Sequence, residues 1–317
     1  MVETIPGAFS QPVGDRRPRV GYACVVAAAV LFAVNGTVSK VILDTGISSL
    51  RLTELRCAGA LVGLVLLLVA LDPQRLRVTR RELPLLAAFG ICGVAATQWF
   101  YFVAIARLPV GIALLFEYTA PVLVALWARF VLHEHVRNRV WAALALALGG
   151  LALVAEIWSG SSLDGLGVAA AFAAALALAA YYLLGEHSTT SRDPLSTTFW
   201  SFVFATAFWS LLQPWWSFPA SSFTGGTSLL GNVADVSVPL WTLAAWMVVL
   251  GTIAPFVLVL TGLRHLPATR VGVVGMLEPV LAAAVAWAWL GEALSTVQLA
   301  GGFVVLAGIV LAQTARS

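Results

Sequence analysis

Long apolar segments alternate with short polar breaks along almost the whole chain. A transmembrane helix needs about 20 mostly apolar residues, and charged residues, prolines and glycines divide the chain into ten segments of about that length. The predicted spans are 20–43, 50–71, 85–105, 110–132, 139–157, 166–186, 196–216, 238–262, 269–290 and 295–314. The pattern therefore predicts an all-α polytopic membrane protein with ten transmembrane helices.

The second half of the chain repeats part of the first half. A shift of 158 residues lays Pro279 over Pro121 and Glu292 over Glu134, and the match over 108–153 keeps 13 identities in 46 positions. Because each repeat holds five spans, an odd number, the second copy is inserted upside down relative to the first. Inverted repeats are typical of secondary transporters, which bind substrate near the middle of the membrane at the repeat interface.

The repeats divide the chain into three parts, and the arginines predict how these parts are oriented. The tail takes residues 1–19, the first repeat 20–157 and the second repeat 166–315. Thirteen arginines fall on one side of the predicted membrane, whereas only Arg51 and Arg107 fall in the loops on the other side. Since basic residues concentrate on the cytoplasmic side, we expect both termini in the cytoplasm and the protein in the bacterial inner membrane.

Composition supports the membrane assignment and excludes several other classes of protein. Hydrophobic residues make up 60% of the chain, charged residues 10%, and the mean hydropathy is +0.94, whereas soluble domains carry about 25% charged residues. The three cysteines lie alone in apolar segments, which indicates neither disulfides nor a zinc site. No phosphate-binding glycine loop or catalytic motif is present in the sequence. We therefore expect no enzyme activity, cofactor, metal or nucleic-acid partner, and only small-molecule substrate and membrane lipid as ligands.

Two carboxylates inside predicted spans are the first candidates for a functional site. Ionisable groups within a span are costly, face the bundle interior or water, and mark functional sites. Glu278 lies in the ninth span beside Pro279, which removes a backbone hydrogen bond, and Glu117 lies in the fourth span. Two interpretations stay open for each: binding of a substrate cation or a proton, or a structural pairing, for Glu117 with Arg56 or Lys40.

The two cations differ in their expected depth. Lys40 lies near the outer end of the first span, where its stem would reach the interface. Arg56 lies deeper in the second span, cannot lose its proton and needs a partner, so a structural role competes with substrate binding. Glu54 lies on a different helix face and is a poor partner for Arg56. Glu134 and Glu292 occupy equivalent helix ends and are expected to form capping or gate contacts.

Polar and aromatic residues within the spans would complete the pocket. The candidates that we assign to substrate or proton binding, besides the two carboxylates and the two cations, are Asn35, Gln98, Trp99 and Tyr118. Further aromatic groups at similar depth are Tyr101, Tyr181, Tyr182 and Trp246.

Several short motifs follow one another along the chain: FAVNGTVSK (Phe32–Lys40), Leu55-Arg56, QWFYFVAIARLP (Gln98–Pro109), LHE (Leu132–Glu134) and LGE (Leu290–Glu292). In their order and spacing these motifs resemble the EamA branch of the drug/metabolite transporter superfamily over nearly the whole chain. The resemblance implies a bundle in which spans 1–4 and 6–9 surround a central cavity and spans 5 and 10 lie outside. It also implies movement of small metabolites, often export of amino acids.

The sequence thus predicts a secondary transporter that exports amino acids or similar small metabolites by alternating access. Proton antiport and facilitated diffusion remain open. The alternatives are an exporter of hydrophobic drugs, a flippase of lipid-linked intermediates, or a membrane sensor that transports nothing. The glycine-rich faces of spans 5 and 10 would support either a homodimer or close packing inside one bundle.

Overall fold

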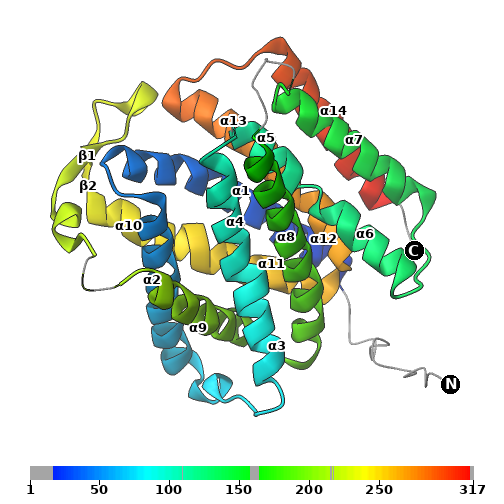
Figure 1. Ribbon diagram of the computed structural model, residues 1–317, viewed down its shortest axis with the longest axis horizontal. Helices are drawn as coiled ribbons and strands as arrows, with labels where there is room; N and C mark the ends of the chain where they lie inside the picture. Colours follow the sequence, from blue (N-terminus) through cyan, green and yellow to red (C-terminus); the bar gives the residue numbers. More distant parts are fainter. Residues whose placement is uncertain (1–16, 109, 158–163, 215, 217, 315–317) are drawn as a thin grey trace.

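The computed structural model describes residues 17–108, 110–157, 164–214, 216 and 218–314 (Figure 1). The first sixteen residues of the predicted tail, and with them Arg16, lie outside the described residues, as do Pro109 and Arg316. Nine described helical segments are long and apolar enough to cross a membrane, and a tenth apolar helix is shorter. These segments coincide with the ten predicted spans, so the predicted all-α polytopic fold is confirmed.

The first repeat begins with two long helices and continues through interrupted ones. Its elements are α1 (Pro18–Asp44), α2 (Ser49–Leu71), η1 (Pro73–Leu76), α3 (Leu83–Ala88), η2 (Phe89–Ala95), α4 (Ala96–Ile105), α5 (Val110–Glu117), α6 (Ala120–Phe130) and α7 (Asn138–Val154). The segment α3–η2–α4 forms the third span, and α5–α6 forms the fourth.

The second repeat follows the same plan and adds a small hairpin. Its elements are α8 (Gly165–Ser191), α9 (Pro194–Leu212), η4 (Ala220–Thr224), β1 (Gly226–Ser228), η5 (Gly231–Val233), β2 (Ser237–Pro239), α10 (Leu240–Val248), η6 (Val249–Ile253), α11 (Ala254–His265), α12 (Ala268–Gly275), α13 (Leu277–Leu290) and α14 (Thr296–Thr314). Strands β1 and β2 pair antiparallel, with Thr227 opposite Val238.

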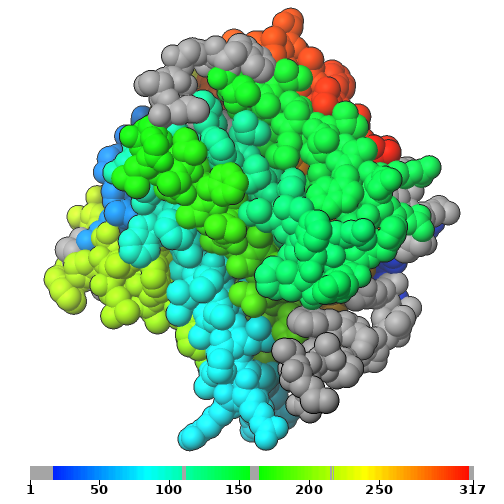
Figure 2. All heavy atoms as spheres, turned by 45° about the vertical axis from the view of Figure 1, so that its right-hand side comes forward, coloured from blue at the N-terminus to red at the C-terminus, as the bar shows by residue number. Residues whose placement is uncertain are grey.

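The bundle has two chemically different ends. We call the end that carries Arg75, Arg192 and Arg264 the basic end, and the end that carries residues 213–239 the loop end. In Figure 1 the loop between α2 and α3 marks the basic end at the bottom, and the β1–β2 hairpin marks the loop end at the upper left. Figure 2 shows the α2–α3 loop, in cyan, projecting beyond the rest of the molecule.

Short polar side chains begin the second span of each repeat. Ser48 accepts a hydrogen bond from the Arg51 backbone N–H at the start of α2, and Asp193 accepts one from the Ser196 N–H at the start of α9. These caps satisfy backbone donors that have no partner within the helix. The equivalent spans of the two repeats therefore start in the same way at opposite ends of the bundle.

A pair of equivalent glycines brings the first helix of each repeat against the other repeat. A Cβ added at Gly21 would lie 2.7 Å from Leu266 Cγ, and one at Gly167 would lie 2.8 Å from Leu108 Cγ. The leucines are 158 positions apart, whereas the glycines are 146 apart (167 − 21). The same contact thus occurs twice, as expected for inverted repeats, with a changed offset in the first helix.

The fifth and tenth spans, α7 and α14, pack against each other at the edge of the bundle (Figure 1). A Cβ at Gly150 would lie 2.7 Å from the Gly301 carbonyl oxygen, and one at Gly308 would lie 2.8 Å from the Ala143 carbonyl oxygen. These glycines therefore allow the two helices to approach closely within one chain. A homodimer through the outer faces of the same helices stays a prediction.

Candidate functional site

The fourth and ninth spans are both interrupted at the same point of the repeat. Helix α5 ends at Glu117 and α12 ends at Gly275, which are 158 residues apart. Pro121 and Pro279 follow the two interruptions, and each proline lacks the N–H that would bond the carbonyl four residues earlier. Irregular backbone at membrane depth is tolerated where it is buried in protein or lines a water-filled space. The breaks therefore mark an internal, polar part of the bundle.

Two carboxylates meet beside these breaks. Glu117 and Glu278 are both half-buried and close enough to interact electrostatically. The Tyr118 hydroxyl is within hydrogen-bonding reach of the Glu278 carboxylate, and Tyr101 and Tyr182 also interact with both carboxylates. Acidic groups from both repeats and hydroxyls from the third, fourth and sixth spans therefore share one site.

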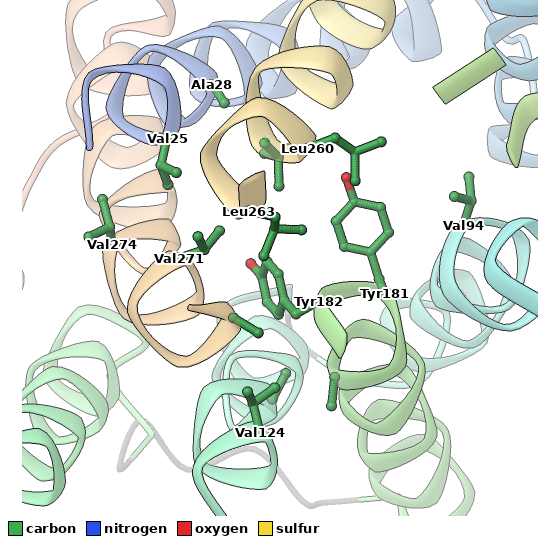
Figure 3. Close-up of a cluster of buried hydrophobic side chains, with 14 of the residues drawn as sticks. Val25, Ala28, Val94, Val124, Tyr181, Tyr182, Leu260, Leu263, Val271 and Val274 are labelled. Atoms are coloured by element: carbon green, nitrogen blue, oxygen red, sulfur yellow. The ribbon is translucent and has the colours of Figure 1, made fainter. Parts of the chain in front are cut away.

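Glycine at the second break makes room for one of these hydroxyls. A Cβ at Gly275 would lie 2.9 Å from Tyr182 Oη, so a larger residue would displace the tyrosine. Figure 3 shows Tyr182 projecting from α8 between Leu263 of α11 and Val271 of α12. Its ring also packs edge-on against Tyr181, with ring centroids 5.7 Å apart.

Arg56 contributes the positive charge of the site. Its side chain attracts the Glu278 carboxylate, and its Nε donates to Thr252 Oγ1 at 3.2 Å. Gln98 lies on the same side, within reach of the neighbouring Cys57 thiol. The group thus holds two carboxyl groups and one guanidinium, and Glu117 has no cation beside it among the described residues.

A π-helical turn interrupts the third and eighth spans at equivalent positions. Gly93 lies in η2 and Gly251 in η6, again 158 residues apart. A Cβ at Gly93 would lie 3.0 Å from Tyr181 Cα, and one at Gly251 would overlap Asn35 Oδ1. Each π-helical turn therefore presses its glycine against the first helix of the other repeat.

The structure brings together most, but not all, of the residues predicted for the site. Glu117, Glu278, Tyr118 and Arg56 form one group, and Gln98 lies beside Cys57 at its edge. Asn35 Oδ1 and Gln98 Oε1 are buried and have no hydrogen-bond partner among the described residues. Asn35 itself is 5% exposed and packs on η6.

Lys40 and Trp99 lie apart from the carboxylates. Lys40 forms an ion pair with Glu292 at the loop end. Trp99 is 38% exposed and packs on Phe208 of α9, with ring centroids 5.4 Å apart. Sequence reasoning also missed Thr252, whose only signal was a single hydroxyl residue inside an apolar span.

Each end of the bundle is held by a partly buried arginine at the start of the second span of a repeat. At the loop end, Arg51 pairs with Glu54 at 2.7 Å and donates to the Pro214 carbonyl at 3.1 Å. At the basic end, Arg192 pairs with Glu82 at 2.9 Å and donates to the carbonyl of Arg77. These contacts tie each helical hairpin to a loop of the other repeat.

The hydrogen bonds of Glu82 stabilise its charged form. The Thr79 backbone N–H, followed by the Arg192 guanidinium, lowers the pKa of the Glu82 carboxyl to about 2. This basic-end ion pair therefore stays charged at neutral pH.

At the loop end the ninth span is bonded to the first span and to the loop of residues 213–239, and we call these contacts the loop-end gate. It consists of the Lys40–Glu292 ion pair, the bond from Asn232 Nδ2 to the Ala288 carbonyl (3.0 Å), and the bond from Trp289 Nε1 to the Leu229 carbonyl (2.8 Å).

The equivalent contact is absent at the basic end of the described chain. Glu134 is the counterpart of Glu292, is exposed, and forms no side-chain bond to any described residue. The described structure is thus closed between α1 and α13 at the loop end, without the corresponding side-chain closure at the basic end.

This constellation of inverted repeats, broken spans and a polar midpoint can be compared with known proteins. The model of the EamA-like transporter family matches residues 19–155 and 165–314. The chain belongs to the EamA-like transporter family. The resemblance seen in the sequence motifs is therefore confirmed, and the protein is a multi-pass membrane protein of a transporter family.

Relatives cover most of the chain. An uncharacterized transporter of Archaeoglobus fulgidus is 29% identical over 93% of this chain and 96% of its own length. The threonine/homoserine exporter RhtA of Escherichia coli K12 is 28% identical over 80% of this chain and 76% of its own length. A solved crystal structure superposes with a TM-score of 0.74 at 18% identity, covering 93% of this chain and 96% of that chain. That likeness shows the fold alone.

Proposed function

We propose that this EamA-family protein exports amino acids or closely similar metabolites across the bacterial inner membrane by alternating access. The observation that carries the proposal is the meeting of Glu117 and Glu278, one from each repeat, beside two broken spans. Secondary transporters with inverted repeats bind their substrates at such breaks. The RhtA relatives are named threonine/homoserine exporters, which supports amino acids as the substrate class.

The orientation of the described state follows if the basic end faces the cytoplasm, as the arginines predict. The loop-end gate then closes the outer side, and the site is reached from the cytoplasm. This is the state in which an exporter loads its substrate. Both termini lie in the cytoplasm under this assignment.

The two carboxylates have different surroundings, from which we assign different roles. Glu278 is in the first turn of α13, where the positive end of the helix dipole stabilises an anion, and it also faces Arg56 and Tyr118. Glu117 is at the negative end of α5 and faces no cation among the described residues. Glu278 is therefore the fixed anchor for a substrate ammonium group, and Glu117 is the carboxylate that exchanges a proton.

Counterflow in proteoliposomes tests both roles. Proteoliposomes that contain the purified protein are loaded with each amino acid of a panel, and exchange is measured with and without a pH gradient. We expect Glu278→Gln to lose saturable exchange, and Glu117→Gln to keep exchange but lose its response to the gradient. Asp235→Asn, which neutralises an exposed loop carboxylate, is the matched control and should behave as the wild type.

Each outcome bears on a separate part of the proposal. Normal exchange by Glu278→Gln would refute the substrate site. A wild-type protein that ignores the pH gradient would indicate facilitated diffusion and refute the proton role of Glu117. Absence of exchange across the whole panel would refute amino acids as the cargo.

A further inference from the structure

Thr252 occupies a special position in the π-helical turn of the eighth span. Its side chain is 1% exposed, and its hydroxyl donates to the Met247 carbonyl at 2.9 Å. That carbonyl is five residues earlier, which is the spacing of hydrogen bonds in a π-helical turn. The equivalent residue of the third span is Val94, which has no hydroxyl. The feature is therefore specific to the second repeat.

The Thr252 hydroxyl has a fixed direction. A hydroxyl carries one hydrogen and two acceptor lone pairs, and the hydrogen is used by Met247. The oxygen can then only accept, and it does so from Arg56 Nε at 3.2 Å. Two hydrogen bonds through one hydroxyl thus link the Met247 carbonyl, just before the π-helical turn, to the cation of the site.

Holding Arg56 by Nε determines which of its donors remain available. No described residue hydrogen-bonds the two terminal Nη atoms, which form the end of the planar guanidinium. Two parallel donors of this kind match the two oxygens of a carboxylate. Glu278 lies near enough to attract the same guanidinium, so a bound ammonium group and a bound carboxylate would be held next to each other.

We propose that Thr252 is a positioning residue that orients Arg56 to bind the α-carboxylate of the substrate. This inference rests on the proposed function and adds a source of selectivity. An amino acid uses both Arg56 and Glu278, whereas the amine that lacks the carboxylate uses Glu278 alone. Thr252 therefore matters for amino acids and not for the corresponding amines.

The test compares threonine with 1-amino-2-propanol, its amine without the carboxylate, in the counterflow assay. We expect Thr252→Val to raise KM for threonine about tenfold or more, the loss typical of a removed hydrogen bond to a charged group, with kcat changed much less. The amine should be exchanged as by the wild type. Thr252→Ser keeps the hydroxyl and should restore the preference for threonine. If another amino acid is the better substrate, it and its decarboxylated amine replace the pair.

Thr97→Val is the matched control. Thr97 bonds the Gly93 carbonyl at 2.6 Å in the other π-helical turn and bonds no arginine, so its removal should leave the preference unchanged. Thr252→Ala serves as a second variant if the valine does not fold, as judged by thermal melting of the purified protein.

The outcomes separate this inference from the proposed function. Wild-type exchange of amino acids with an unchanged preference in Thr252→Val and Thr252→Ala would overturn the positioning role alone. An equal loss for threonine and the amine would also overturn it, because that pattern indicates a general structural effect. Absence of amino-acid exchange by the wild type would overturn the proposed function itself.

Discussion

The loop-end gate gives a prediction whose size follows from the structure. Replacing Lys40 by Gln removes the ion pair with Glu292, whose side chains are 60% and 48% exposed. Water and salt screen such a pair, so it is worth only about 0.2 to 1 kcal/mol. The equilibrium between closed and open forms at the loop end should therefore shift by about 1.4- to 5-fold.

The other two gate contacts keep the closed form populated when the ion pair is removed. The hydrogen bonds of Asn232 and Trp289 to carbonyl groups remain, and each contributes about 0.5 to 1.5 kcal/mol. We expect Lys40→Gln to open the gate more often and to leave the closed form populated. Glu292→Gln should have the same effect, and exchanging the two charges in one variant should largely restore closure.

Opening can be measured by the reaction of a single cysteine with a membrane-impermeant maleimide added at the loop end. Asn35→Cys, in a protein whose native cysteines are replaced, places the thiol about 7.5 Å along α1 from Lys40. The labelling rate should rise about 1.4- to 5-fold in either gate variant. Glu134→Gln is the control and should label as the parent does. No change, or a rise well above tenfold, would refute the assignment of a weak, solvent-screened gate contact.

Two further predictions concern stability. Arg192→Gln should lower the melting temperature at pH 7 and make it less sensitive to acid. The pKa of the Glu82 carboxyl is about 2, against an ordinary 4.5, so the charged carboxylate stabilises the fold above pH 4.5. This contribution disappears as the pH falls from 4.5 toward 2. An unchanged acid response of the melting temperature in the variant would contradict this prediction. His133 and its equivalent Gly291 both adopt left-handed backbone, with φ of 56° and 72°. His133→Gly should therefore raise the free energy of unfolding by about 0.5 to 1 kcal/mol after allowing for glycine entropy, and Gly291→His should lower it by about the same amount. Thermal melting measures both, and shifts of the same sign would refute this account.

Much of the fold could be predicted from the sequence because membrane spans depend on local composition. Ten apolar segments of the right length predicted the spans, and Pro279 predicted where the ninth is distorted. The ungapped repeat was visible only from residue 108 onward. The first helices of the repeats are offset by 146 rather than 158 residues, as Gly21 and Gly167 show, so one shift could not align both parts.

The missing parts of the site depend on contacts between distant segments. The π-helical turn at Gly251 accompanies its close approach to Asn35, and no local pattern specifies that approach. The bond between Thr252 and Arg56 joins residues 196 positions apart. Hydropathy likewise indicated the depth of Lys40 but not its neighbour, so Lys40 was grouped with the substrate site although it pairs with Glu292.

The repeats share a scaffold but differ in chemistry where they meet. Breaks and π-helical turns recur in both repeats, which fits the proposed alternating access, in which the two ends open and close by similar movements. The proposed substrate, in contrast, is a single asymmetric molecule, so a site shared by the two repeats needs different groups at equivalent positions. Accordingly, the counterpart of Glu117 is Gly275, and the Tyr182 hydroxyl packs where a side chain at Gly275 would lie. A second carboxylate at this position would add negative charge and displace the tyrosine, which explains why the second repeat carries its acid three residues later, at Glu278.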